Sequence, residues 1–185
     1  MSNTVWGMQG SWHETAAYMN RDISQCVGAD AVEKGTIRRW LEPKEFDCPL
    51  HYDDATAKAA GYEGIIAPGT MAITYGLPAY WQPGDPHSKP GYLPKQIPMP
   101  VVFNVPAPCS RAFATSMEIE FFAPMYVGDQ LSCTSKLVDI THKSLRVGEG
   151  AFLKQQDTYV NQKGDIVAIA NIVIFRFQPK EEQGG

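Results

Sequence analysis

The sequence lacks the features that mark several large classes of protein. Its 185 residues contain no apolar run near the roughly 18 residues that a membrane-spanning helix needs, and its first ten residues lack the basic and apolar regions of a signal peptide. It also lacks a long run of like charge, since 16 basic and 20 acidic residues are spread along the chain and give a net charge of -4. We therefore expect no nucleic-acid partner, no membrane partner and, by default, a cytoplasmic location.

Cysteine pairs typical of metal binding are also absent. The four cysteines, Cys26, Cys48, Cys109 and Cys133, form no Cys-x-x-Cys motif, which argues against a zinc site or a redox motif. We expect reduced thiols, no metal site and no bound cofactor. Cys48 stays open as a nucleophile because it lies near His51, although the neighbouring carboxylates disfavour its thiolate.

The first half of the chain contains helical patterns. One covers residues 31–40, a short alanine-rich one precedes Gly61, and a third follows Pro68. Asp53 or Asp54 can cap the alanine-rich helix, and Gly61 can end it. Pro68 suits the first turn of the third helix, whose apolar residues from Met71 onward include no charged side chain. We expect this third helix to be buried on nearly all sides.

The second half is typical of long antiparallel strands. Strand patterns occupy residues 115–122, 131–146, 151–160 and 166–177, and Asn161–Gly164 predicts a hairpin turn between the last two. The final strand is apolar on both faces, as expected in the middle of a sheet. Helices followed by strands predict a single α+β domain over residues 1–185, with its core at 31–177 and a frayed tail at 178–185.

A proline-rich segment separates the two halves. Residues 81–108 contain eight prolines, which exclude a long helix and a central strand. Apolar side chains are interleaved with these prolines. The segment is therefore either an ordered apolar flap or a plain surface loop.

Four short segments together point to a known family. They are Glu33–Arg39; Pro49–Asp53, followed by Ala57 and Gly61-Tyr62; Ile66–Thr70; and Glu118–Phe121, followed by Pro124 and Gly128-Asp129. In this order and spacing they resemble the MaoC-like hydratases and dehydratases, in particular the FAS1-like or N-terminal MaoC dehydratase domain. The resemblance covers roughly residues 31–177. It implies a hot-dog fold, in which a long bent antiparallel sheet wraps round a buried helix.

The resemblance also implies an activity and a site. Members of the family use an aspartate/histidine dyad and a glycine N–H at the start of the hot-dog helix, which binds the thioester carbonyl. His51 matches the histidine and Gly69 the glycine, and we expect Thr70 and Trp40 to contact the substrate as well. The implied enzyme is a lyase that hydrates trans-2-enoyl-CoA or dehydrates 3-hydroxyacyl-CoA thioesters, with a CoA or acyl-carrier thioester as its substrate.

The aspartate leaves several interpretations open. The family pattern puts it at Phe46, and Asp47 is one residue further along, a shift of about 3.8 Å between Cα atoms. Asp47 and His51 form a working dyad in the first interpretation. In the second, the chain is a degenerate, substrate-accommodating subunit of a heteromeric hydratase whose partner brings the dyad. In the third, it is a hot-dog thioesterase or an acyl-CoA-binding module.

The expected fold also predicts a partner chain. A single hot-dog sheet leaves an exposed edge strand, which associates readily unless it is paired or covered. Members of the family pair two such domains. We therefore expect either a homodimer or a heterodimer with another hot-dog subunit.

Overall fold

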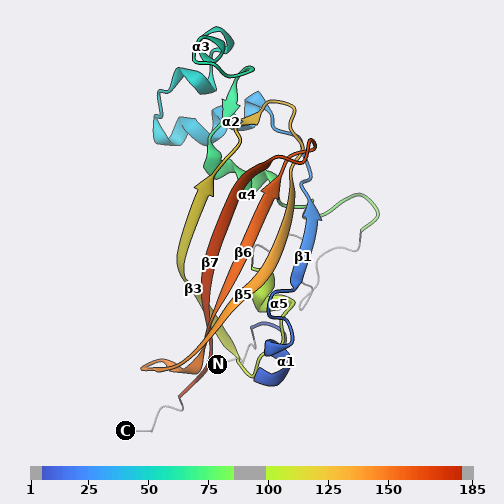
Figure 1. Cartoon of the computed structure of the whole chain (residues 1–185), viewed down its shortest axis with the longest axis vertical. Helices are drawn as coiled ribbons and strands as arrows, with labels where there is room; N and C mark the ends of the chain where they lie inside the picture. Colours follow the sequence, from blue (N-terminus) through green and yellow to red (C-terminus); the bar gives the residue numbers. More distant parts are fainter. Residues whose placement is uncertain (1–5, 86–98, 181–185) are drawn as a thin grey trace.

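The computed structural model describes residues 6–85 and 99–180 of the chain. One five-stranded sheet dominates these residues, with the strand order β1-β5-β6-β7-β3 and every neighbouring pair antiparallel (Figure 1). The strands are β1 (Asp22–Val27), β3 (Arg111–Phe121), β5 (Ser132–Leu145), β6 (Gly148–Val160) and β7 (Ile166–Pro179). The predicted strands of the second half are therefore confirmed, and β7 lies between two others, as its apolar faces indicate.

Several strand boundaries differ from the expectation, since β3 begins at Arg111 and β6 at Gly148, earlier than predicted, and β1 was not predicted. β1 has no strong period in the sequence, and it gains its strand conformation by pairing with β5 at one edge of the sheet. β7 continues to Pro179, two residues into the predicted tail, because Gly148 and Glu149 of β6 pair with its last residues. The predicted turn at Asn161–Gly164 is confirmed, with Gly164 in the left-handed region that favours glycine.

The helices are short. They are α1 (Trp12–Ala16), α2 (Lys34–Leu41), α3 (Asp54–Ala59), α4 (Ala72–Tyr75) and α5 (Pro100–Phe103), with 3-10 turns at Glu42–Lys44, Pro49–His51 and Gly69–Met71. Asp53 caps α3 through a bond of 2.6 Å from the Thr56 N–H to its carboxylate, as predicted. A small second sheet joins β2 (Ile66–Ala67) to β4 (Met125–Tyr126).

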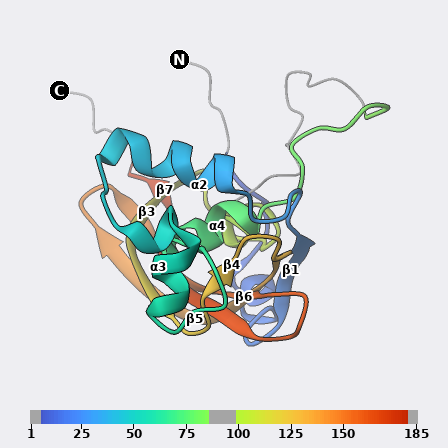
Figure 2. The ribbon, with the colours of Figure 1, turned by 90° about the horizontal axis from the view of Figure 1, so that it is seen from above.

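The helix predicted after Pro68 lies inside the curve of the sheet. It consists of the 3-10 turn at Gly69–Met71 followed by α4, and Met71, Ala72 and Tyr75 are buried. Viewed from above, the sheet curves round α4 (Figure 2), and Figure 1 shows α2 and α3 beyond one end of the strands. This arrangement confirms the α+β hot-dog fold.

The proline-rich segment is only partly described. Residues 86–98, nearly half of the predicted flap, lie outside the described residues. Past them, α5 begins at Pro100, and Val101 and Val102 are fully buried on the same side of the sheet as α4. Within residues 6–85 and 99–180, no helix is long and apolar enough to cross a membrane.

Candidate active site

Two segments of the chain position His51, the 3-10 turn that contains it and strand β2. Pro49 starts the 3-10 turn that ends at His51, and the half-buried imidazole places Nδ1 at 2.8 Å from the Ile66 carbonyl oxygen in β2. A carbonyl oxygen only accepts hydrogen bonds, so Nδ1 carries the proton. In the neutral ring, Nε2 is therefore the free base. A backbone carbonyl, and not a carboxylate, sets the orientation of this histidine.

The family position of the catalytic aspartate holds an aromatic ring. The rings of Phe46 and His51 lie 5.8 Å apart between centroids and 37° from parallel. Glu45 adopts a left-handed conformation, which turns the chain just before Phe46, and the Tyr52 hydroxyl donates a bond of 2.9 Å to the Phe46 carbonyl. Asp47 is exposed, and within the described part of the chain no hydrogen bond or ion pair joins it to His51.

Gly69 begins the helical segment at the same end of the sheet. Neither the Gly69 N–H nor the Thr70 N–H has a hydrogen-bond acceptor among the described residues, as is usual in the first turn of a helix. A Cβ atom at Gly69 would lie 2.6 Å from the Phe121 ring, so the backbone approaches β3 closely here. Ile66, Gly69 and Phe121 share the lining of a groove of 270 Å³.

The other predicted contact residues have simpler surroundings. Thr70 is exposed, and Trp40 is half-buried on α2 against the core beside α4. The Lys44 ammonium lies 4.1 Å from the Trp40 ring centroid, a cation–π geometry. Cys48, the alternative nucleophile, is half-buried and directly precedes the 3-10 turn that contains His51. Among the described residues, no group of three His, Cys, Asp or Glu side chains could hold a metal ion.

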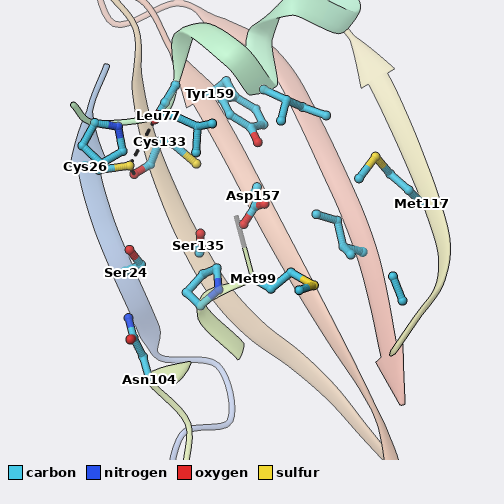
Figure 3. Close-up of a pocket in the computed structure, with 16 residues that line it drawn as sticks. Ser24, Cys26, Leu77, Met99, Asn104, Met117, Cys133, Ser135, Asp157 and Tyr159 are labelled. Atoms are coloured by element: carbon cyan, nitrogen blue, oxygen red, sulfur yellow. Dashed lines mark hydrogen bonds between the residues drawn. The ribbon is translucent and has the colours of Figure 1, made fainter. Parts of the chain in front are cut away.

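A second set of residues was missed by the sequence reasoning. They line a cavity of 430 Å³ between the inner face of the sheet and the segment that contains α4 and α5, and they include Ser24, Cys26, Cys133, Ser135, Asp157 and Tyr159 (Figure 3). These polar residues come from β1, β5 and β6, and cross-strand pairing brings Cys133 opposite Tyr159 and Ser135 opposite Asp157. The sequence contained a pattern that indicates these residues, because 133 and 135, and likewise 157 and 159, are alternate positions that face the core in predicted strands.

Burial perturbs the acid–base chemistry of this cavity. Desolvation raises the pKa of Asp157, although the Ser135 hydroxyl and the Gln155 amide act against that rise. Desolvation also raises the pKa of Tyr159. The Cys133 thiol lowers the pKa of Cys26 to about 7, while the Cys26 sulfur and burial raise the pKa of Cys133.

Comparison with known proteins identifies the family of this chain. A family model described as "FAS1-like, dehydratase domain region" matches residues 22–170. A "Probable enoyl-CoA hydratase alpha subunit" of Thermomonospora curvata is 27% identical over 84% of this chain and 48% of its own length. A "3-oxo-4,17-pregnadiene-20-carboxyl-CoA hydratase alpha subunit" of Mycobacterium tuberculosis is 31% identical over 83% of this chain and 47% of its own length.

The chain thus spans about half the length of these two curated relatives. Among solved structures, the ChsH1-ChsH2 complex from Mycobacterium tuberculosis includes a chain with the same fold, at a TM-score of 0.69 and 23% identity over 93% of each chain. The matched family model covers most of the sheet, the His51 loop and the helical segment at Gly69. This protein therefore belongs to the FAS1-like dehydratase-domain family of MaoC-like hot-dog proteins.

Proposed function

We propose that this chain takes part in the hydration of trans-2-enoyl-CoA thioesters, and in the reverse dehydration of 3-hydroxyacyl-CoA, as a lyase. Its membership of the dehydratase-domain family and the hydratase names of its two curated relatives support this activity. His51 and Gly69, which lie at one end of the sheet, are the proposed core of the site.

The chemistry needs a base and an oxyanion site. During hydration, the base takes a proton from water as the water oxygen bonds to C3, and the C2=C3 electron pair shifts toward the thioester oxygen. A proton then adds to C2, which completes the 3-hydroxyacyl product. His51 Nε2 suits the role of the base. The free N–H groups of Gly69 and Thr70 suit the developing negative charge on the thioester oxygen.

One observation carries this proposal, namely the bond of 2.8 Å between His51 Nδ1 and the Ile66 carbonyl oxygen. In the neutral imidazole it leaves Nε2 unprotonated, and it ties the histidine to the strand that leads through Pro68 to Gly69. Gly69 follows Ile66 by three positions, a span of at most about 11 Å. In this proposal the base and the oxyanion donors therefore serve one thioester group.

The family dyad has a second catalytic group, a carboxylate, and two arrangements differ in which chain supplies it. In the arrangement that we favour, which differs from the heteromer interpretation of the sequence in keeping His51 as the base, another hot-dog subunit supplies the carboxylate and this chain accommodates the substrate. The Phe46 ring beside His51 supports it, since no carboxylate occupies the family position in this chain. The alpha-subunit names of the relatives, and the complex in which the similar solved chain is found, also fit a heteromer.

In the alternative arrangement, Asp47 completes a dyad with His51 in this chain alone. The exposed Asp47 carboxylate supports this candidate, because it is free to turn toward bound substrate. Trp40 and Thr70 would then flank the thioester in either arrangement, and the two differ only in the origin of the carboxylate.

Edge strand β3 is the proposed contact with the second hot-dog subunit. It is the longer of the two edge strands, and its exposed residues include Phe113, Met117 and Phe121, with Phe122 directly after it. Unpaired backbone groups beside exposed apolar side chains favour pairing with another chain.

The test is a spectrophotometric assay of the purified chain with crotonyl-CoA and with longer and aromatic enoyl-CoA esters. Loss of the conjugated thioester absorbance reports hydration. Activity that appears only after addition of a hot-dog protein encoded next to this one would select the heteromer, and activity of the chain alone would select the Asp47 dyad. Release of free CoA would instead identify a thioesterase, and inactivity in every mixture would refute the hydratase proposal.

A further inference from the structure

The cavity on the inner face of the sheet begins close to the proposed thioester site. Ile73 and Gly76 line the cavity, and Ile73 follows Gly69 by four residues. Four residues rise about 6–8 Å along the 3-10 turn and α4 that join these positions. A thioester whose carbonyl oxygen is bound at Gly69 can therefore extend its acyl group past Ile73 into the cavity.

The cavity has the size and walls of a site for a bulky apolar ligand. Its 430 Å³ lies within the range of about 300–1,000 Å³ that is usual for small-molecule sites. Ile73, Leu77, Met99, Met117 and Ile172 supply apolar surface. Polar groups line the cavity as well, since Ser24, Ser135 and Asp157 come from β1, β5 and β6, and Asn104 directly follows α5 (Figure 3).

Asp157 is the only ionisable carboxyl group among the described lining residues, and none of them is basic. Its side chain is 3% exposed. Gln155 Nε2 donates to both carboxylate oxygens at 2.8 Å, and the Ser135 hydroxyl also stabilises the charge. Two carboxylate oxygens accept about four hydrogen bonds. Acceptor capacity therefore remains, and it faces the cavity.

A purely structural role accounts for part of this arrangement. The Gln155 side-chain oxygen accepts a bond of 3.0 Å from the Val101 N–H, so Gln155 holds the start of α5 against the sheet, and Asp157 fixes Gln155. That role requires only an acceptor for the Gln155 amide, which a neutral asparagine would provide as well. It does not require a buried carboxylate, whose desolvation is costly unless its acceptor sites are filled.

We propose that the cavity binds the acyl body of the substrate, and that Asp157 accepts a hydrogen bond from a hydroxyl group carried on that body, away from the thioester. The substrate class is then a bulky apolar acyl thioester with a hydroxyl substituent. That the ligand is an acyl group rests on the proposed function. The preference of the cavity for a hydrogen-bond donor rests on Asp157 alone.

The experiment uses a matched pair of ring compounds, trans-decalin-2-ol and trans-decalin-2-one. The hydroxyl group of the alcohol can donate a hydrogen bond, whereas the carbonyl group of the ketone can only accept one. The affinities of both compounds for the full chain are measured calorimetrically at pH 8, because burial raises the pKa of Asp157 and an alkaline solution favours its ionised form. Protection of Cys26 from iodoacetamide, followed by peptide mass spectrometry, reports that the compound occupies the cavity, because Cys26 lines it. The variants are Asp157→Asn and, as a matched control, Asp139→Asn, which makes the same change at an exposed carboxylate outside the cavity lining.

We expect the wild-type chain to bind the alcohol at least about tenfold more tightly than the ketone, since a bond to a charged acceptor supplies such a factor. Asp157→Asn should remove or reverse the preference, because its amide donates to the ketone, while Asp139→Asn should keep it. Equal binding of the two compounds by the wild type, or an equal loss of both in Asp157→Asn, would overturn the assignment. So would binding that leaves Cys26 unprotected.

The two proposals fail separately. A preference for the alcohol in a chain that hydrates no thioester, alone or in a complex, would keep the donor site and remove the hydratase. Hydration without that preference would keep the hydratase and remove the donor site. If Asp157→Asn does not fold, the preference of the wild type and the protection of Cys26 still decide the outcome.

Discussion

The His51 imidazole and the Ile66 carbonyl form the bond on which the candidate site depends, with Nδ1 2.8 Å from the oxygen. It joins a 3-10 turn to a two-residue strand across 15 positions of sequence. Because the carbonyl fixes the tautomer, the chemical role of His51 can be separated from its structural one by the choice of substitution.

His51→Asn should abolish hydration and leave the fold intact. The asparagine amide can still donate to the Ile66 carbonyl, but it offers no base in place of Nε2. We expect a fall of at least about a hundredfold in kcat, since general bases contribute about 10²–10⁴. The free energy of unfolding in urea should change by no more than about 1 kcal/mol. Activity within tenfold of the wild type would exclude His51 as the base.

Asp47→Asn should have a much smaller effect than His51→Asn in the heteromeric complex. Asp47 is exposed and makes no hydrogen bond to His51 among the described residues, so its charge contributes little to the imidazole. We expect kcat to fall by less than about tenfold. A loss as large as that of His51→Asn would establish the Asp47 dyad in place of a carboxylate from the partner.

Asp157→Asn should stabilise the fold increasingly as the pH rises from 4 to 7. Burial raises the pKa of Asp157, so the folded state favours its protonated form. The wild type therefore loses stability as the pH rises through the folded pKa, and asparagine, which does not ionise, loses none. Urea denaturation at several pH values measures the difference.

Asp54→Asn is a control for which the pH dependence of the stability should have the opposite sign. Lys58 lowers the pKa of Asp54, so the wild-type advantage is present at neutral pH and is lost as the pH falls through the folded pKa. This effect should be small because the pair is exposed. A pH-independent difference between wild type and Asp157→Asn would contradict the burial argument.

Cys26 should be the cysteine of the inner face that is alkylated first at neutral pH. The Cys133 thiol lowers the pKa of Cys26 to about 7, and the side chain is half-buried at the cavity. Iodoacetamide reacts with the thiolate, so the labelling rate of Cys26 should rise between pH 6 and 8. Buried Cys109, with its pKa raised to about 11, serves as the internal control. Labelling of Cys109 as fast as Cys26 would disprove the expectation.

Met117→Lys should weaken association with the second hot-dog subunit. Met117 is 49% exposed on edge strand β3, and charged side chains on an edge oppose strand pairing. Because Met117 also lines the inner cavity, the measured quantity is association and not activity. Sedimentation velocity should show a shift toward the single chain. Val147→Lys is the matched control, since Val147 is 47% exposed in the turn between β5 and β6. An equal effect of both substitutions would argue against β3 as the interface.

Local patterns in the sequence anticipated the regular elements well. The strands at Ser132–Leu145 and Ile166–Pro179 follow from hydrophobic runs whose period or length favours a strand over a helix. The Asp53 cap follows from a contact between side chain and backbone within three residues. Strand β1 was not anticipated, because six weakly patterned residues become a strand only when β5 supplies their hydrogen-bond partners.

The sequence by itself determined the family, the hot-dog fold, and the choice of His51 and Gly69, since each depends on residue types at short, ordered spacings. Only the tertiary structure decided which groups surround them. It placed the Ile66 carbonyl and the Phe46 ring beside His51, and it brought Cys26, Ser135 and Asp157 from three strands to one cavity. The reason is physical: strand register and loop turns set distances between residues far apart in the chain, and burial then sets their acid–base chemistry.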